Sequence, residues 1–249
     1  MATIFCAFPC YQGVNPVQTT FSLLAMTMDL MRHGHGVGWS TLTFPNIARV
    51  RNAFLSYWYY KGDASHILMI DSDMSFDEGL VNKMLDEDQP VVAAVYPKKD
   101  GSGDFVGSFL PNEKPNERGF MRVRGSGGGL LLIRRDAIDK LLEHDPTLVR
   151  EDVQSRLVYQ ILQPRMKLDK VITAFDEMEM PDWVFNDGTV APMELSEDIS
   201  FCHRIREAGM EVWASVTHPI GHVSPNHEFR GCLINLEGSD EKSDTGKSV

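Results

Sequence analysis

The chain has 249 residues, of which 43% are hydrophobic and 24% charged, and its formal net charge is −11. This length and composition fit one large α/β domain, or at most two small ones, with a sizeable core. An acidic surface repels nucleic acid and anionic membranes, so neither is an expected partner, although a local basic groove can still hold a phosphate.

The sequence begins MATIFCAFPC, without a basic segment or a long apolar run. We therefore expect no signal peptide and no membrane span. Four cysteines are present, and none forms a CxxC pair. Buried free thiols in a reducing, cytoplasmic protein are expected rather than a disulfide framework.

The first half of the chain alternates short apolar runs with stretches of helical periodicity. An apolar run closed by Pro9 predicts the first strand, and a continuous apolar run at 66–70 predicts a buried parallel strand. Gly62 is expected to end the second helix. In chain order we expect strand 3–8, helix 17–32, strand 38–44, helix 47–58, strand 66–70, helix 81–85 and strand 91–96.

The second half is more irregular. A glycine-rich turn at 125–129 precedes an expected strand at 130–133, and Asp136 is the expected N-cap of a helix that reaches Glu143. A further helix is expected at 153–162, one from Ser196 to Gly209, and a last strand at 212–216. The polar tail, residues 237–249, is expected to be disordered.

Strands that alternate with helices predict an α/β fold: a mostly parallel sheet flanked by helices, formed as a single domain by residues 1–236. Ligands of such sheets bind beyond the carboxyl ends of the strands. The residues directly after each strand are therefore the candidates for a site.

Asp71, Ser72 and Asp73 follow the apolar strand at 66–70. Carboxylates two residues apart in an extended chain point to the same side and can hold one hard cation. Mg²⁺ and Mn²⁺ prefer such oxygen ligands and often bridge to substrate phosphates. The structural alternative is a solvated acidic turn, but burying two acids beside an apolar strand is costly unless a cation or donors compensate.

Arg51 and Asn52 lie on the expected helix before that strand. They can fix a phosphate or a sugar through charged and polar hydrogen bonds, while the alternative is a surface arginine on an amphipathic helix. The glycines at 127–129 let the backbone approach a ligand, but a tight turn before a core strand explains them without one. They match neither a P-loop nor the dinucleotide GxGxxG spacing.

Glu197 and Asp198 open the helix that follows Ser196. Acids in a first turn are favoured by the helix dipole alone. Alternatively, one of these carboxylates faces the site and takes a proton from an acceptor hydroxyl. His222 follows the last expected strand and can complete a metal shell or only hydrogen-bond within its loop, whereas His218 is expected to be structural.

Together these segments resemble the GT-A glycosyltransferases, close to family 2 and to the Anp1/Mnn9-like mannosyltransferases. The resemblance covers about residues 3–231, and its segments occur in family order. They are FPCYQG, ARVRNAFLSYW, HILMIDSDMSF, VVAAVYPKK, GGGLLLIRR, LSEDISFCHRIREAGMEVWA and IGHVS. The order of these segments is far more specific than any one of them.

The resemblance implies a Rossmann-like, nucleotide-binding GT-A fold and a nucleotide-sugar donor such as a UDP- or GDP-sugar. It implies that Asp71 and Asp73 play the DxD role, with Asp73 the firmer metal ligand. Asp198 falls where the inverting enzymes keep their base, and His222 where many keep a further metal ligand. Pro9 and Tyr11 fall in the loop that usually meets the nucleotide base.

The sequence hypothesis is therefore an inverting, metal-dependent glycosyltransferase using Mn²⁺ or Mg²⁺. Arg51, Asn52 and the 71–73 segment would seat the donor, and a glycan, a lipid or another hydroxyl compound would be the acceptor. One alternative is a sugar nucleotidyltransferase, which would carry an Arg- or Lys-bearing glycine-rich loop after the first strand; FPCYQG lacks it. The other is a non-catalytic nucleotide-sugar-binding protein of the same fold.

Overall fold

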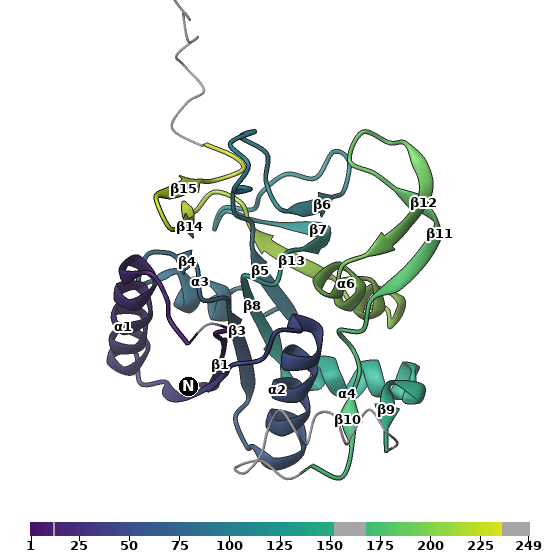
Figure 1. The fold of residues 1–249 in the computed structure, drawn as a ribbon, viewed down its shortest axis with the longest axis horizontal. Helices are drawn as coiled ribbons and strands as arrows, with labels where there is room; N and C mark the ends of the chain where they lie inside the picture. Colours follow the sequence, from purple (N-terminus) through teal and green to yellow (C-terminus); the bar gives the residue numbers. More distant parts are fainter. Residues whose placement is uncertain (12, 152–167, 236–249) are drawn as a thin grey trace, which may run out of the picture.

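The computed structural model describes residues 1–11, 13–151 and 168–235 (Figure 1). The helix expected at 153–162 and the tail at 237–249 lie outside these residues. In the described part of the chain, no helix combines the length and the apolar character needed to cross a bilayer. Cys6, Cys10 and Cys202 are buried free thiols, as expected, and Cys232 is half-buried.

A mixed sheet of eight strands forms the centre of the described structure (Figure 1). Its order is β2-β1-β3-β8-β5-β13-β7-β6. Strands β7 and β8 run against the other six, so the sheet is mostly parallel in direction. The strands are β1 Thr3–Pro9, β2 Gly36–Leu42, β3 His66–Ile70, β5 Val91–Ala94, β6 Gly107–Phe109, β7 Phe120–Ser126, β8 Leu130–Arg134 and β13 Val212–Ser215.

Helices cover both faces of this sheet, as the alternating pattern predicted. On one face α2 (Ile47–Lys61), α4 (Arg135–His144) and α6 (Glu197–Glu207) pack on a core that includes Ile67 and Met69 of β3. On the other face α1 (Val17–Arg32) and α3 (Leu80–Asp86) pack on a core that includes Leu68 and Ile70. The continuous apolar run of β3 is therefore explained by burial on both of its faces.

The ends of most predicted elements agree with the structure within two or three residues. Gly62 is the C-cap residue of α2, and Asn46 caps its start by accepting a hydrogen bond from the backbone N–H of Arg49 at 2.9 Å. The prediction of Asp136 as N-cap of α4 is wrong: Arg134 holds that place, and Asp136 lies in the first turn, where it pairs with Arg134.

Several short pairings were not predicted. The hairpin of β11 (Met178–Val184) and β12 (Val190–Leu195) extends from the main sheet, and β9 (Val149–Arg150) pairs with β10 (Val171–Ile172) after a 3-10 turn at Pro146–Leu148. A third small sheet joins β4 (Met74–Ser75), β14 (Ile220–Ser224) and β15 (His227–Gly231). The β11–β12 hairpin and the sheet of β4, β14 and β15 lie beside the candidate site.

Candidate functional site

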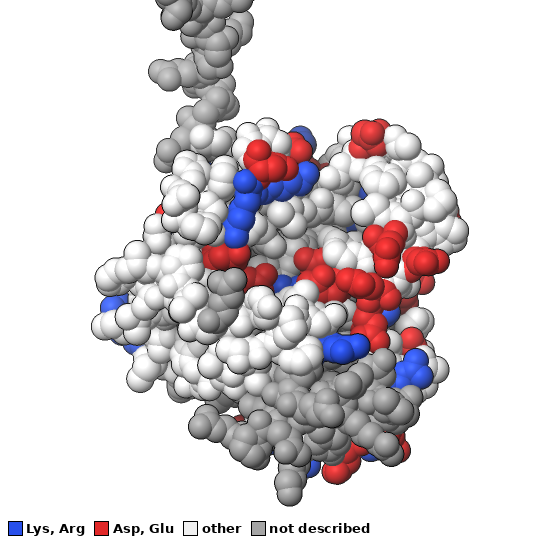
Figure 2. Space-filling view, in the orientation of Figure 1, with Lys and Arg blue, Asp and Glu red and all other residues white. Residues whose placement is uncertain are grey.

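Acidic side chains gather across the middle of the face shown in Figure 2. Asp71 follows β3, and its backbone N–H donates to the carbonyl of Gly129 at 3.0 Å. Because β8 is antiparallel to β3, the start of β8 lies at the same edge as the end of β3. The glycines before β8 and the acids after β3 therefore meet at the carboxyl edge of the sheet.

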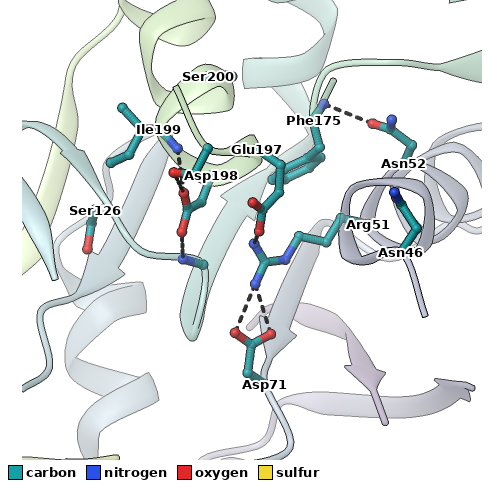
Figure 3. Close-up of polar contacts among 12 residues, drawn as sticks. Asn46, Arg51, Asn52, Asp71, Ser126, Phe175, Glu197, Asp198, Ile199 and Ser200 are labelled. Atoms are coloured by element: carbon teal, nitrogen blue, oxygen red, sulfur yellow. Dashed lines mark hydrogen bonds and ion pairs between the residues drawn. The ribbon is translucent and has the colours of Figure 1, made fainter. Parts of the chain in front are cut away.

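Arg51 of α2 is the buried centre of this edge (Figure 3). Its Nη2 donates to both carboxylate oxygens of Asp71 at 2.9 Å, and its Nη1 donates to Oε1 of Glu197 at 2.5 Å. Arg51 is only 1% exposed, and this burial alone would lower its pKa. The two carboxylates outweigh burial and raise the pKa of Arg51 above its ordinary value. Arg51 thus ties α2, the end of β3 and the start of α6 together.

Burial also changes the pKa values of the two acids that pair with Arg51. Desolvation raises the pKa of Asp71 and of Glu197, and the charge of Arg51 opposes that rise in both. Sequence analysis placed Arg51 as a candidate donor contact. In the structure its guanidinium is engaged by protein carboxylates, although its Nε has no partner among the described residues.

The three glycines at 127–129 each pack against a side chain of the protein. A Cβ at Gly128 would collide with the guanidinium of Arg51, and one at Gly127 or Gly129 would collide with the ring of Tyr96. The backbone N–H of Gly128 also donates to Oδ2 of Asp198 at 2.9 Å. The glycine-rich turn is therefore required by the close packing of Arg51 and Tyr96.

Asp198 is held by three hydrogen bonds (Figure 3). Besides the bond from Gly128, its Oδ1 accepts from the Ser196 hydroxyl at 2.5 Å and from the Ile199 N–H at 2.8 Å. Ser196 is the N-cap residue of α6, but its hydroxyl bonds to Asp198 rather than to the helix backbone. Since a carboxylate offers about four lone-pair sites, Asp198 keeps capacity for one further donor.

Asp198 borders a cavity of about 310 Å³. The cavity lies between the start of α6, strand β6 and the β11–β12 hairpin, whose Trp183 and Phe185 contribute aromatic walls. Ser108 of β6 also lines it, and the buried Ser108 hydroxyl has no hydrogen-bond partner among the described residues. A largely enclosed hydroxyl without a partner is costly, so a ligand group that pairs with it would be favoured.

Asp73 lies beside a second group of side chains. Lys99 contacts its Oδ2, and Nε2 of His222 is 3.7 Å from the same oxygen. Burial alone would raise the pKa of Asp73, but its contacts with His222 and Lys99 lower this pKa overall. His222 is brought here by the pairing of β14 with β4, and by the Val223 N–H, which donates to the carbonyl of Asp73 at 2.7 Å.

The tautomer of His222 follows from its other contact. Nδ1 is 2.9 Å from the carbonyl oxygen of Pro97, which can only accept, so Nδ1 carries the proton. Nε2 is the ring nitrogen that faces Asp73. This arrangement, with a backbone carbonyl orienting the imidazole, is the one that metal-binding histidines use.

The donor set fits a divalent cation in part. Asp73 and His222 offer an oxygen and a nitrogen on one side of the site, whereas both oxygens of Asp71 face Arg51. Within residues 1–11, 13–151 and 168–235, no three Asp, Glu, His or Cys side chains are gathered closely enough to form a complete ligand set. Lys99 contacts the same Asp73 oxygen that faces His222.

The remaining predicted residues have different surroundings. Asn52 is buried, donates to Oδ1 of Asp176 and accepts from the Phe175 N–H, each at 2.8 Å, so its amide fixes the segment after β10. Pro9 ends β1, Tyr11 is 62% exposed beyond it, and Ser72 is half-buried between the two aspartates.

Sequence analysis missed Lys99, the role of Glu197 and the aromatic hairpin. The hairpin had a usable signal, because Asp187-Gly188 stands between two runs with strand character. The structure forms a turn there, with the Phe185 N–H donating to the Thr189 carbonyl at 2.8 Å. Nothing in the local sequence indicates that Lys99 would meet Asp73.

No protein-family model and no curated protein sequence matches this chain. Among solved structures, A197 from STIV is 16% identical, with 90% of this chain and 86% of that chain covered and a TM-score of 0.47. A variant of Drosophila beta1,4-galactosyltransferase 7, solved with manganese, UDP-Gal and xylobiose, is 16% identical, with 99% and 82% covered and a TM-score of 0.42.

The mannose-1-phosphate geranyltransferase structure from Thermus thermophilus is 10% identical, with 86% of this chain and 74% of that chain covered and a TM-score of 0.44. At such TM-scores these similarities decide nothing about function. The protein is a single α/β domain with an acid-lined site at the carboxyl edge of a mostly parallel sheet, and its function has to be argued from the residues of that site.

Proposed function

We propose that this protein is a glycosyltransferase that moves a sugar from a nucleotide-diphosphate sugar to an acceptor hydroxyl with inversion. The observation that carries the proposal is the position of Asp198. Its carboxylate is oriented by three hydrogen bonds and borders a cavity, while Asp71, Asp73 and His222 lie along the same edge of the sheet. This arrangement supports an interpretation in which a base, a cation and an acceptor meet in one site.

Asp198 would act as the general base. It takes the proton of the acceptor hydroxyl while that oxygen attacks the anomeric carbon, and the bond from this carbon to the diphosphate oxygen breaks. The sugar is thereby transferred with inversion, and a nucleoside diphosphate leaves. Inversion follows because the attacking oxygen approaches the face of the sugar opposite to the leaving group.

The diphosphate carries negative charge that the acidic site must compensate. A bound Mn²⁺ or Mg²⁺ would supply Lewis-acid neutralisation of the leaving diphosphate, with Asp73 and His222 as ligands and Asp71 as the predicted further one. Lys99 supplies a cation from the chain itself. Arg51 keeps Asp71 and Glu197 in place and so acts as a positioning residue. Pro9, Tyr11 and Ser72 remain predicted donor contacts.

The cavity beside Asp198 would take the acceptor. Trp183 and Phe185 offer apolar faces against which a sugar ring or another flat acceptor can pack, and the Ser108 hydroxyl is available for one of its polar groups. Enclosure between the hairpin and β6 would also exclude water and so limit hydrolysis of the donor.

A panel of nucleotide sugars, each with Mn²⁺ and candidate acceptors, tests the proposal by its products. Release of a nucleoside diphosphate together with a glycosylated acceptor is expected. Pyrophosphate as the product would identify a nucleotidyltransferase instead. Donor binding without any product in the whole panel would identify a binding protein.

Two variants separate the roles within the site. Asp198→Asn should keep donor binding and lower turnover by roughly 10²–10⁴-fold, the usual worth of a general base. Asp73→Asn should abolish Mn²⁺-dependent donor binding while the fold survives. Asp63→Asn, an exposed acid at the opposite edge of the sheet, is the matched control and should change neither. Full turnover in Asp198→Asn, or unchanged Mn²⁺-dependent donor affinity in Asp73→Asn, would remove the corresponding role.

A further inference from the structure

Helix α1 carries a second set of apolar side chains on its outer side. Its exposed apolar side chains form one stripe along the helix, in which Phe21 is 67% and Met31 63% exposed. The stripe consists of Val17, Phe21, Leu24, Met28 and Met31. The buried side of the same helix combines Met26 and Leu30, which belong to the core, with three polar residues, Thr19, Ser22 and Asp29. A surface helix usually keeps polar side chains on its outer side, so the exposed apolar stripe is unusual.

Hydrogen bonds fix α1 in this orientation. The hydroxyl of Ser22 accepts from the backbone N–H of Phe76 at 2.9 Å, and Oδ2 of Asp29 accepts from the amide of Asn82 at 2.6 Å. Rotating α1 to bury its stripe would break both bonds and would leave buried polar groups without partners. The stripe therefore stays on the outside of the described domain.

The apolar surface continues past the helix. A groove of about 490 Å³ runs between α1 and β2, lined by Leu23, Leu24, Met28 and the half-exposed Trp39. Strand β2 is the outermost strand of the sheet at this side. Figure 1 places α1 at the left edge of the molecule with no described element outside it, and the surface there is mostly uncharged in Figure 2. Contiguous apolar surface of this kind marks an interaction site.

The spacing of the stripe indicates the shape of what covers it. Successive members are separated by four, three, four and three residues, a mean repeat of 3.5. This is the repeat of a coiled-coil seam, which keeps one narrow apolar line facing another helix. A helix that packs on a flat apolar surface typically carries a wider apolar face, about 100° or more across. The stripe thus fits a helix as its partner.

We propose that this partner is α1 of a second copy of the chain, packed antiparallel about a two-fold axis at Leu24. The stripe is nearly symmetric in spacing about Leu24. In this arrangement Val17 faces the partner's Met31, Phe21 faces the partner's Met28, and Leu24 faces its own equivalent. Such an interface is isologous and closes at two copies. The Phe–Met pairs would add sulfur–aromatic contacts.

The size of the surface is sufficient for this. The exposed area of the stripe, Val14 and Trp39 is on the order of 700 Å² per copy, comparable with the roughly 800 Å² that each partner buries in a standard stable interface. A membrane surface is the less suitable occupant. Interfacial helices bind anionic lipid through rows of Lys and Arg, whereas α1 has only Arg32 and the chain carries a net charge of −11.

The mass of the full chain in solution tests the proposal. Sedimentation equilibrium from 1 to 100 μM should give twice the chain mass of 28.0 kDa at the higher concentrations. Leu24→Glu places two like charges at the axis and should raise the dissociation constant by roughly 100-fold or more. Val190→Glu, which changes another exposed valine on β12, is the matched control and should leave the dimer intact. A monomer at 100 μM, or a dimer indifferent to Leu24→Glu, would overturn the proposal.

Cross-linking tests the antiparallel register. In a Cys232→Ser background, Leu24→Cys should be joined to itself by a short bismaleimide. Val17→Cys should be joined only to Met31→Cys in a mixture of the two variants. Self-linking of Val17→Cys would indicate parallel helices and would contradict this geometry. Co-sedimentation of a monomeric wild-type chain with neutral or anionic vesicles, lost in Leu24→Glu, would assign the stripe to a membrane and overturn the second copy as its partner.

Discussion

Helices α1 and α2 have 16 and 15 residues and both carry apolar residues at helical spacing, but only α1 leaves a stripe of large apolar side chains exposed. Helix α2 buries Phe54 and Trp58 and carries Arg51 inward with them. Helix α1 buries Ser22 and Asp29 and leaves Phe21 in solvent. The comparison shows that a periodic apolar stripe predicts a helix but not the surface that covers it.

The difference lies in the partners that each helix meets across its inward side. Arg51 of α2 meets Asp71 and Glu197, so its burial is compensated by two charges. Asp29 of α1 meets Asn82, and Met26 and Leu30 of the same helix cover the apolar core on this face, so the stripe is left outside. The polar residues decide the orientation of both helices, because an unpaired buried polar group costs more than an exposed apolar one.

The largest effect that we expect on the α2 side is from Arg51→Ala. The change leaves Asp71 and Glu197 partly buried without a counter-charge, and it should lower the free energy of unfolding by about 3–5 kcal/mol. Urea denaturation of both proteins measures this. Arg49→Ala, two residues earlier on the same helix, should stay within about 0.5 kcal/mol, because Arg49 makes no ion pair with any described residue. Equal losses in both variants would contradict the central role of Arg51.

A matched pair of phenylalanines sharpens the comparison directly. Phe54 of α2 is fully buried against Phe5, with ring centroids 6.2 Å apart, so Phe54→Ala should cost about 3–5 kcal/mol. Phe21→Ala should change the stability of the monomer by no more than about 0.5 kcal/mol. The measurement is urea denaturation at 1 μM chain. A large loss in Phe21→Ala under these conditions would mean that the stripe is covered within one chain.

The strands and helices around the central sheet could be predicted because continuous or periodic apolar runs indicate which residues are buried. His66–Ile70 and Leu130–Arg134 are examples, and both lie at the centre of the sheet. The sequence cannot reveal that β8 runs antiparallel to β3, since the direction of a strand depends on its connections. The β14–β4 pairing, only two residues long, has no local pattern to detect.

The candidate site was predictable in its residue types rather than in its contacts. Asp71, Asp73 and Asp198 lie near one edge of the sheet, and His222 faces Asp73 from the small sheet of β4, β14 and β15. The assignment of Arg51 to a ligand did not anticipate that it bridges two carboxylates, because Glu197 is 146 residues away in the sequence. The role of the three glycines was hidden for the same reason, since their close neighbours Arg51 and Tyr96 come from other elements.

A smaller effect on stability is expected when His66 is exposed to acid. His66 lies at the start of β3, the strand that α1 and α2 cover from opposite faces. Burial, with help from the nearby Arg134, lowers the pKa of His66 to about 4. The unfolded chain binds this proton near pH 6.5 and the folded chain only near pH 4, so stability should fall as pH decreases through this window. Thermal unfolding at pH 7.5 and 5.5 measures the change. His66→Gln should lose less stability between these two values than the wild type, and an equal loss would assign the acid sensitivity to other groups.

The smallest effect has the opposite sign and concerns the inward side of α1. Thr19 is fully buried, and its hydroxyl has no hydrogen-bond partner among the described residues. Thr19→Val keeps the shape of the side chain and replaces the hydroxyl by a methyl group, so it should stabilise the protein by about 0.5–1 kcal/mol. Thr20→Val is the control, because the Thr20 hydroxyl is exposed and accepts from the Asn15 amide at 2.7 Å.

We expect Thr20→Val to be neutral or slightly destabilising, since it removes an exposed hydrogen bond. Urea midpoints of the two variants, taken at 1 μM chain so that association does not contribute, decide between them. If Thr19→Val is destabilising, its hydroxyl has a partner, such as a buried water, and the inward side of α1 is as well satisfied as that of a conventional helix. If Thr19→Val is stabilising, the buried Thr19 hydroxyl of α1 lowers the stability of the domain. The buried Arg51 of α2 differs, because two carboxylates compensate for its burial.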